Sequence, residues 1–453
     1  MVFAVVVVLL VIGTVAFHFL SPWWFTPIAS NWEAMDQTVN VTFWVTGIVF
    51  VLVNLFMAYA VVKYRHRKDR PGQTAHYEPE NKKLEWWLTG ITSVGIAAML
   101  APGLAVWAKF VTPPDTANAV EVMGQQWNWS YRLPGKDGAM GLSDNRLVSI
   151  TNPFGLDPKD PKGQDDILIA NPELHLPLNY EVKMLLRSID VNHQFAVPQF
   201  RVKMDMVPGM VTTFWFKTTR TGSFDALCEQ LCGLAHFAMR GRVLVESDEE
   251  YQTWLAKQPT FAQMQAASAG DPAIGQAHYA VCSACHGAQG EGNRDLNAPK
   301  LAGQAPWYLI RQLQAFKNGV RGGPEDKNEF AQQMAPMAMT LPDDAAVKNV
   351  VAYITSLQDS RPTPTVFGNP QRGKRIYENC TACHGASGQG IWATHAPRLS
   401  SMSDWYLKRQ LETFKEGGRG VHRMDFYGSQ MASMAKPLQP DAINDVVDYM
   451  HNL

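Results

Sequence analysis

The stretch from Cys228 to Met239 reads CEQLCGLAHFAM and places four side chains that can bind a soft metal within twelve residues. Cys228 and Cys232 carry thiols, His236 carries an imidazole and Met239 carries a thioether. Thiolates and thioethers favour copper(I), zinc or iron–sulfur centres, and imidazole suits copper and zinc. The C-x3-C-x3-H-x2-M spacing therefore indicates a metal-binding loop.

A second imidazole lies about 35 residues upstream, where His193 in SIDVNHQF follows an alternating run typical of a strand. Two Cys, two His and one Met suit a centre of two copper ions bridged by both sulfurs. The alternative is a disulfide between Cys228 and Cys232 in an oxidising compartment, with His236 at the surface. That alternative leaves His193 and Met239 without a role.

These residues resemble the copper A loop of cytochrome c oxidase subunit II, whose pattern C-x-E-x-C-G-x-x-H-x-x-M follows a strand end of the form D-V-x-H. The resemblance implies dinuclear copper A bridged by both thiolates. Its implied ligands are His193, Cys228, the backbone carbonyl of Gln230, Cys232, His236 and Met239. Many members carry Glu at position 230, and that side chain also reaches magnesium. A carbonyl ligand does not depend on the side chain, so copper binding is expected, while magnesium binding is left open.

The other four cysteines form two C-x-x-C-H motifs inside an internal repeat. WYL, RQL and Phe-Lys segments recur at the same offset as the motifs, so two copies of one domain lie in tandem. C-x-x-C-H is the attachment signature of c-type haem, in which two thioethers hold the porphyrin and the His is the proximal iron ligand. The predicted haem residues are Cys282, Cys285 and His286 in the first copy, and Cys380, Cys383 and His384 in the second.

A haem that only transfers electrons is expected to have a Met as its sixth ligand. Each copy contains an M-A-x-M-A frame, MAPMA in the first and MASMA in the second. The copies resemble the tandem dihaem cytochromes c, whose ligand is the first Met of such a pair. This resemblance implies Met334 and Met431, with Met337 and Met434 as the alternatives.

The N-terminal part contains three apolar runs, each long enough to cross a bilayer as a helix. They predict transmembrane helices at 41–62 and 84–108, and at 1–20 either a third helix or an uncleaved signal. Residues 63–83 carry seven Lys and Arg, whereas 21–40 carry none. The positive-inside rule then places 63–83 in the cytoplasm and everything after Ala108 outside it. We expect a multi-pass protein of the bacterial inner membrane with its soluble domains on the periplasmic face.

The subunit II resemblance also implies roles for two further residues. Its members carry a Glu in E-x-x-W-T that helps admit protons to a channel in subunit I. Glu85 takes this place, although Leu88 stands at the Trp position, and a Glu that reaches interfacial water is the alternative. The first Trp of a W-x-W-x-Y stripe receives electrons from cytochrome c in this family, which implies Trp127. Trp129 and Tyr131 are expected to pack in the core.

Between 115 and 256, short alternating runs separated by Gly, Pro and Asp predict a cupredoxin-like β-sandwich for the copper A domain. A linker is expected at 257–272, followed by α-helical cytochrome c domains at 273–358 and 367–453. The fold class is thus multidomain, with transmembrane helices, a sandwich and two haem domains. Histidines without a counterpart in the other copy are predicted at the surface: His278, His395, His422 and His451.

A membrane anchor, copper A and two haems c together predict a membrane-bound protein that transfers one electron at a time. The formal net charge of −1 gives no argument for nucleic-acid binding. The chain resembles subunit II of a caa-type cytochrome c oxidase with two haem domains. Such a subunit takes electrons from cytochrome c or another periplasmic donor and passes them to haem a of subunit I, where oxygen is reduced to water and protons are pumped. Subunit III is a further expected partner. The alternative is an electron-transfer subunit of a nitric oxide or nitrous oxide reductase.

Overall fold

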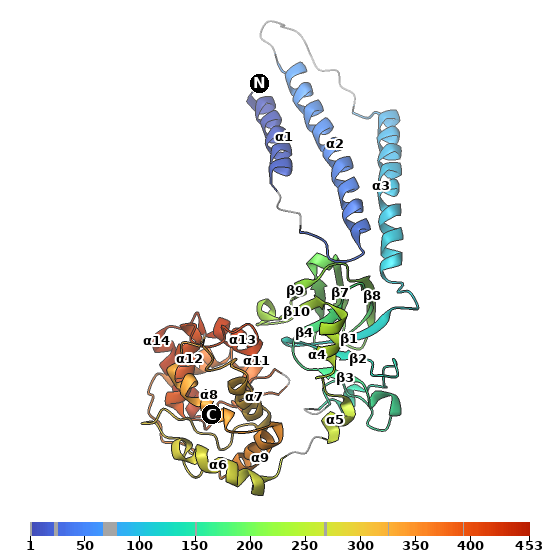
Figure 1. Cartoon of the computed structure of the whole chain (residues 1–453). Coiled ribbons are helices and arrows are strands. Elements are labelled where there is room, and N and C mark those ends of the chain that lie inside the picture. The colour runs from blue at the N-terminus through green and yellow to red at the C-terminus, as the bar shows by residue number, and fades with distance from the viewer. Residues whose placement is uncertain are drawn as a thin grey trace.

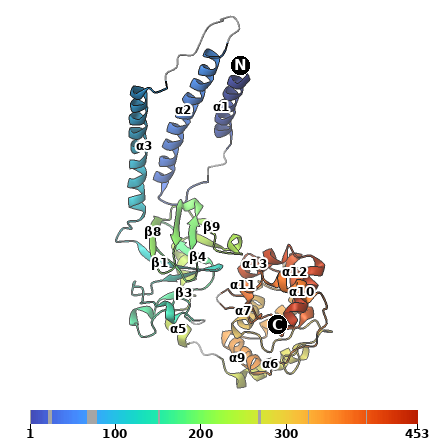
Figure 2. The same ribbon diagram turned by 180° about the vertical axis from the view of Figure 1, so that it is seen from behind.

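The computed structural model describes residues 2–21, 26–66, 79–149, 152–266, 270–324, 326–392 and 394–453. Three long helices stand at one end, a β-sandwich lies below them, and a helical lobe lies beside the sandwich (Figure 1). Seen from behind, the lobe again meets the sandwich through its C-terminal half (Figure 2). The predicted fold class is confirmed. Part of the predicted cytoplasmic segment 63–83 lies outside the described residues.

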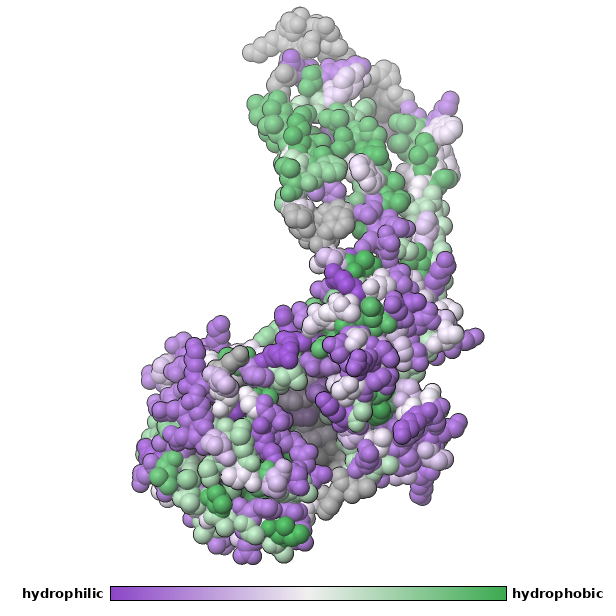
Figure 3. Space-filling model, viewed as in Figure 1, coloured by the Kyte–Doolittle hydropathy of each residue, from purple (hydrophilic) through white to green (hydrophobic). Residues whose placement is uncertain are grey.

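Among the described residues, three helices are long and apolar enough to cross a membrane: α1 (Val2–Leu20), α2 (Glu33–Lys63) and α3 (Lys82–Phe110). Most of their apolar side chains are exposed, as expected for surfaces that face lipid or other subunits. Hydrophobic residues dominate this end of the molecule, whereas the two lower lobes are mostly hydrophilic (Figure 3). The Asn81 side chain accepts a hydrogen bond from the backbone N–H of Leu84 and so caps the start of α3.

The sandwich consists of two five-stranded sheets, ordered β3-β2-β1-β5-β8 and β4-β10-β9-β6-β7. Its strands are β1 (Asn118–Gln125), β2 (Asn128–Leu133), β3 (Ile167–Ile169), β4 (Glu173–Pro177), β5 (Glu181–Ser188), β6 (His193–Val197), β7 (Val202–Met206), β8 (Thr212–Lys217), β9 (Gly222–Cys228) and β10 (Arg240–Glu246). Trp129 and Tyr131 are completely buried, so their predicted packing role is confirmed. Apolar side chains of both sheets form one core, which includes Phe195 and Phe214.

The sandwich is joined directly to the ends of the membrane helices. The Trp32 indole N–H donates to the Trp215 carbonyl at 2.8 Å, and the Trp215 indole N–H donates to the Lys109 carbonyl at 2.7 Å. Arg201 forms a two-pronged ion pair with Asp36, with N–O distances of 2.6 and 2.9 Å. A bidentate pair of this kind fixes orientation as well as distance. The sandwich is therefore held close to the membrane.

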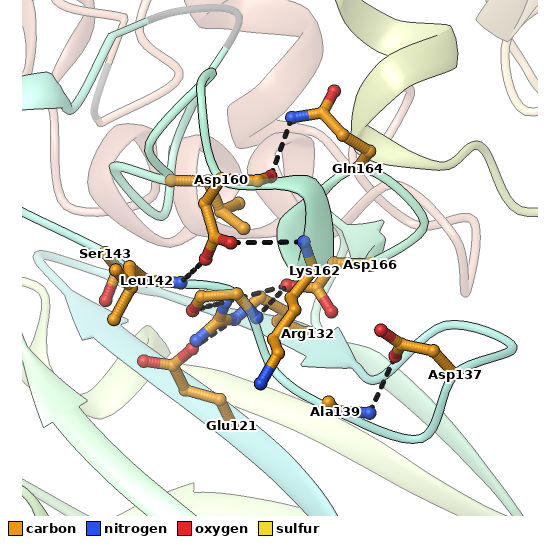
Figure 4. A network of polar contacts seen from close by, with 12 residues as sticks. Glu121, Arg132, Asp137, Ala139, Leu142, Ser143, Asp160, Lys162, Gln164 and Asp166 are labelled. Carbon is orange, nitrogen blue, oxygen red and sulfur yellow. Dashed lines mark hydrogen bonds and ion pairs between the residues drawn. The ribbon is translucent and has the colours of Figure 1, made fainter.

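The loop-rich insertion after β2 is closed by a buried ionic network (Figure 4). Arg132 pairs with Glu121 and, at 2.8 Å, with Asp166, and it donates to the Gly141 carbonyl at 2.9 Å. Burial raises the pKa of Asp166 to about 6 against the pull of Arg132. The structure also corrects the first part of the predicted linker. Phe261, at the start of α5 (Phe261–Ala266), is fully buried against the insertion, because an apolar side chain near a wall of the sandwich gains more by packing than by solvation.

The helical lobe contains the two repeats. Copy one comprises α6 (Pro272–His286), α7 (Pro306–Lys317), α8 (Glu329–Met339) and α9 (Asp344–Ser356). Copy two comprises α10 (Pro370–Tyr377), α11 (Thr381–His384), α12 (Asp404–Lys415), α13 (Phe426–Ala435) and α14 (Pro440–His451). In each copy the last helix packs across the first, which closes a small core around the attachment motif. The short helix α4 (Asp248–Leu255) follows the last strand of the sandwich.

Candidate copper and haem sites

The CEQLCGLAHFAM segment, called the copper loop below, connects two neighbouring strands at one end of the sandwich. β9 ends at Cys228 and β10 begins at Arg240. The adjacent strand β6 begins at His193, and its Phe195 pairs with Cys228 in the antiparallel ladder. Strand pairing thus brings the distant imidazole to the loop, and the local spacing supplies the other donors.

The predicted copper ligands come together around the two cysteines. The sulfurs of Cys228 and Cys232 lie 3.7 Å apart. Cys228 Sγ is 3.9 Å from His193 Nδ1 and 3.2 Å from the Gln230 carbonyl oxygen. Cys232 Sγ is 3.4 Å from His236 Nδ1 and 3.8 Å from Met239 Sδ. One imidazole therefore stands beside each sulfur.

These separations fit metal coordination. Two donors bound to the same ion at bond lengths of roughly 2.0–2.3 Å lie about 3.5 Å apart in a tetrahedral arrangement. The donor set of two thiols, one thioether, two imidazoles and one carbonyl is soft, which favours copper. Among the described residues, His193, Cys228 and Cys232 have ligand atoms within 4.8 Å of one another, close enough to hold one metal ion. The geometry therefore fits a copper centre at this loop.

Neighbouring groups orient the ligands. His193 Nε2 lies 2.8 Å from Asp190 Oδ1, which leaves Nδ1 directed toward Cys228. The Gln126 side chain and the Trp127 indole both donate to the Cys232 carbonyl, at 2.6 and 3.2 Å. Carboxylate and carbonyl partners of this kind fix the tautomer and the position of metal ligands.

The two thiols are electrostatically coupled. A hydrogen bond with Cys232 and another with His193 hold the pKa of Cys228 well below its ordinary range, although burial opposes the shift. The same contact with Cys228, together with burial, raises the pKa of Cys232. The opposite shifts arise from one sulfur–sulfur contact, and bound metal ions would replace the protons of both thiols.

Each haem attachment motif presents its histidine in the same way. His286 Nδ1 lies 2.8 Å from the Pro299 carbonyl, and His384 Nδ1 lies 2.8 Å from the Pro397 carbonyl. Both rings are buried. A carbonyl acceptor keeps the proton on Nδ1 and leaves the Nε2 lone pair free for iron. In both copies, the histidine is therefore arranged as the proximal ligand of a c-type haem would be.

A cavity in copy one is lined by residues of the attachment motif, Cys282, Cys285 and His286, and also by Met334 and Met337. Met334 is half-buried and packs against α7 and α8 side chains, whereas Met337 is 38% exposed. In copy two, Met431 is half-buried and packs against the core. The greater burial of Met334 supports the first Met of the pair as the ligand in copy one.

Sequence reasoning missed four arginines near the boundary between the two copies. Arg311, Arg409 and Arg419 are hydrogen-bonded to the other copy, and Arg321 lines the cavity of copy one. Each has a buried N–H group without a partner among the described residues, and none takes part in the ion pairs found there. Buried charges without counter-ions are costly. Two haems carry four propionate carboxylates, which would supply these partners. The arginines recur at the repeat offset, as Arg311 with Arg409 and Arg321 with Arg419, and that recurrence was the available signal.

The other predicted residues take varied positions. Trp127 is only 3% exposed. Glu85 lies exposed in the first turn of α3. The prediction of surface histidines is wrong for His451, which is 4% exposed, and for His395, whose ring stacks on Tyr427 at a centroid distance of 4.2 Å. Both side chains are covered by neighbouring parts of the helical lobe. Burial lowers the pKa of His395 to about 3.

Comparison with known proteins agrees with this geometry. Residues 118–247 match the family described as cytochrome c oxidase subunit II, periplasmic domain, and residues 272–358 and 370–453 each match cytochrome c. The alternative cytochrome c oxidase subunit 2 of Bradyrhizobium diazoefficiens is 58% identical over 266 residues, which cover 59% of this chain and 95% of that protein. The chain belongs to the cytochrome c oxidase subunit II family.

This subunit II carries a C-terminal cytochrome c extension of the caa type. The extension is similar to cytochrome c4 of Azotobacter vinelandii, at 35% identity over 41% of this chain and 90% of that protein. Among solved structures, the periplasmic domain of subunit II of cytochrome oxidase from Bradyrhizobium japonicum is 29% identical, covering 32% of this chain and 95% of that chain with a TM-score of 0.24. The family places copper and haem c in this subunit II as a component of cytochrome c oxidase.

Proposed function

We propose that this subunit II accepts electrons from a periplasmic donor at its haem domains and passes them through dinuclear copper A to haem a of subunit I. When bound, the copper and haem groups exchange one electron at a time. His193, Cys228, Gln230, Cys232, His236 and Met239 would hold the copper ions, and the two C-x-x-C-H motifs with Met334 and Met431 would hold the haems.

The observation that carries this proposal is the arrangement around the paired sulfurs. Cys228 and Cys232 lie 3.7 Å apart, with His193 beside the first sulfur and His236 beside the second. Two thiolates that bridged two copper ions would let the ions share one electron, so little rearrangement would be needed on reduction. Oxygen reduction and proton pumping would take place in subunit I.

We further propose that the three apolar helices lie in the bacterial inner membrane, with the soluble domains on its periplasmic face. Subunits I and III would cover the exposed helix surfaces. Glu85 would assist proton uptake from the cytoplasmic side, since an exposed carboxylate at this depth is costly without a partner or a role.

The test is the composition and activity of the complex purified with its natural partners. Two copper ions and two haems c per chain, haem a in subunit I, and cyanide-sensitive oxygen uptake are expected. A partner that reduces nitric or nitrous oxide and not oxygen would replace the oxidase proposal with the alternative. Less than one copper ion per chain in an intact complex would contradict the proposed copper A centre.

A further inference from the structure

The two haem copies differ in how they meet the sandwich. Cys285 of copy one is exposed. Its counterpart Cys383 is half-buried and packs against the core cluster that contains Trp127, Cys232 and Met239. The attachment edge of copy two is thus covered by the copper domain, while the equivalent edge of copy one is open.

The hydrogen bonds of this contact come from α13. Its Gln430 side-chain amide donates to the Trp127 carbonyl at 2.6 Å and to the Ala238 carbonyl at 3.4 Å. Ala238 lies between two predicted copper ligands, and the helix also lies against the short turn His236–Ala238. Both ribbon views show α13 at the side of the lobe that faces the sandwich (Figures 1 and 2).

The residue after Gln430 is Met431, the predicted iron ligand of copy two. A predicted haem ligand, Met431, therefore lies next to Gln430, whose side chain is hydrogen-bonded to the copper loop. On the copper side, the Trp127 indole donates to the Cys232 carbonyl at 3.2 Å. Electron transfer slows steeply with distance, so the haem of copy two has the short route to the copper loop.

Trp127 is only 3% exposed: its indole lies against the copper loop, and Gln430 of α13 is hydrogen-bonded to its backbone carbonyl. Its family role as the acceptor from a soluble cytochrome c needs an accessible surface. A separate protein docking there would first have to displace α13, which the chain itself holds in place at high effective concentration.

We propose that copy two is the immediate electron donor to copper A and that the external donor delivers its electrons to copy one. Gln430 is the residue that positions copy two against the copper loop. This inference rests on the proposed function. In this step the iron of copy two goes from ferrous to ferric and the copper pair gains that one electron. No bond or proton changes place. The order is donor, copy one, copy two, copper.

The first test compares Gln430→Ala with its counterpart on α8, Gln333→Ala, in the complete complex. Rapid mixing with reduced cytochrome c, followed at the haem and copper absorption bands, gives the rate of copper reduction. Gln430→Ala should slow that rate about five-fold or more by loosening the contact, and Gln333→Ala should leave it unchanged. Gln430→Lys, which keeps an N–H donor for the two carbonyls, should restore most of the rate.

Unchanged haem potentials and an unchanged copper spectrum in Gln430→Ala would show that the haems and the loop are intact, so that the effect lies in the contact. Equal rates in Gln430→Ala and the native protein would overturn the positioning role of Gln430. If the native complex contained no copper, the proposed function itself would be contradicted.

The second test separates the two haems. Met431→His and Met334→His should each lower the potential of one haem by exchanging its axial ligand, which loss of the Met–iron charge-transfer band would verify. In Met431→His, the donor should reduce the haem of copy one at the native rate, and the electron should stop there with copper still oxidised. In Met334→His, neither haem should be reduced rapidly. The opposite pattern, or rapid copper reduction in either variant, would overturn the proposed order.

Discussion

His193 Nε2 lies 2.8 Å from Asp190 Oδ1, and this contact directs the other ring nitrogen to the sulfur of Cys228. Asp190 also accepts from the Gln126 backbone N–H at 2.6 Å, so one carboxylate joins the ligand strand to the Gln126–Trp127 turn. The orientation of a copper ligand therefore depends on a side chain that does not touch the copper position.

Asp190→Asn should weaken copper binding. The His193 ring and the Gln126 N–H contact different oxygens of the carboxylate, and an amide replaces one of these acceptors with an NH2 donor, so one of the two contacts is lost. Loss of such a partner typically costs about 10–100-fold in metal affinity. Competition with a copper chelator measures the affinity, and Asp225→Asn, at an exposed position of β9, is the control. An affinity equal to that of the native chain would contradict the orienting role.

His236→Ala should remove the copper centre and leave both haems in place. This imidazole is 3.4 Å from Cys232 Sγ, whereas the attachment motifs lie in another lobe. Metal analysis and haem spectra of the purified complex measure both quantities. Oxygen uptake driven by reduced cytochrome c should fall to background. Normal oxygen uptake without copper would contradict the proposed electron path through copper A.

Arg321→Gln should lower the reduction potential of the haem in copy one. The guanidinium lines that cavity, and its Nε has no partner among the described residues. A positive charge near the haem favours the reduced iron by on the order of 1 kcal/mol, which for one electron is roughly 50 mV. Spectroelectrochemical titration measures the shift. Exposed Arg294→Gln in the same copy is the control, and equal potentials in the two variants would exclude a propionate contact for Arg321.

His175→Gln should flatten the pH dependence of sandwich stability. Burial opposes protonation of this ring, but its contacts with Glu173 at 3.3 Å and Glu246 at 2.9 Å outweigh burial and raise the pKa of His175. A raised native pKa stabilises the fold below the unfolded value of about 6.5, and this stabilisation is lost as the pH rises through the native pKa.

Urea unfolding followed by tryptophan fluorescence at pH 6 and pH 8 measures this effect, since Trp254 stacks on the ring at 4.3 Å. The native sandwich should lose stability between these pH values. His175→Gln should lose less, and be about 1–3 kcal/mol less stable at pH 6. His278→Gln, in the haem lobe, should retain the native slope. An identical slope for His175→Gln would show that another group titrates.

The copper and haem residues could be predicted because their spacing is local. Cys228 and Cys232 are held close by a short loop, and a C-x-x-C-H motif needs only one helical turn. His193 required the further assumption that a strand end lies beside the loop, which the pairing of β6 with β9 supplies.

Contacts between domains could not be predicted in the same way. Arg321 and Arg419 lie in the turns after α7 and α12 and look like surface residues in the sequence. Contacts between the two copies help to bury them, such as those of Arg419 with Tyr308 and Gln312. The covered state of Trp127 depends on where α13 lies, and a single sequence contains no local pattern that specifies this. His395 was misjudged for the same reason.

The measurement that tests the central claim most directly is rapid mixing of the fully oxidised complex with a reduced periplasmic cytochrome c, with haem c and copper A followed separately. The account predicts that haem c is reduced first, that copper A is reduced next as haem c is partly reoxidised, and that oxygen uptake follows. Reduction of copper A before any haem c would contradict it.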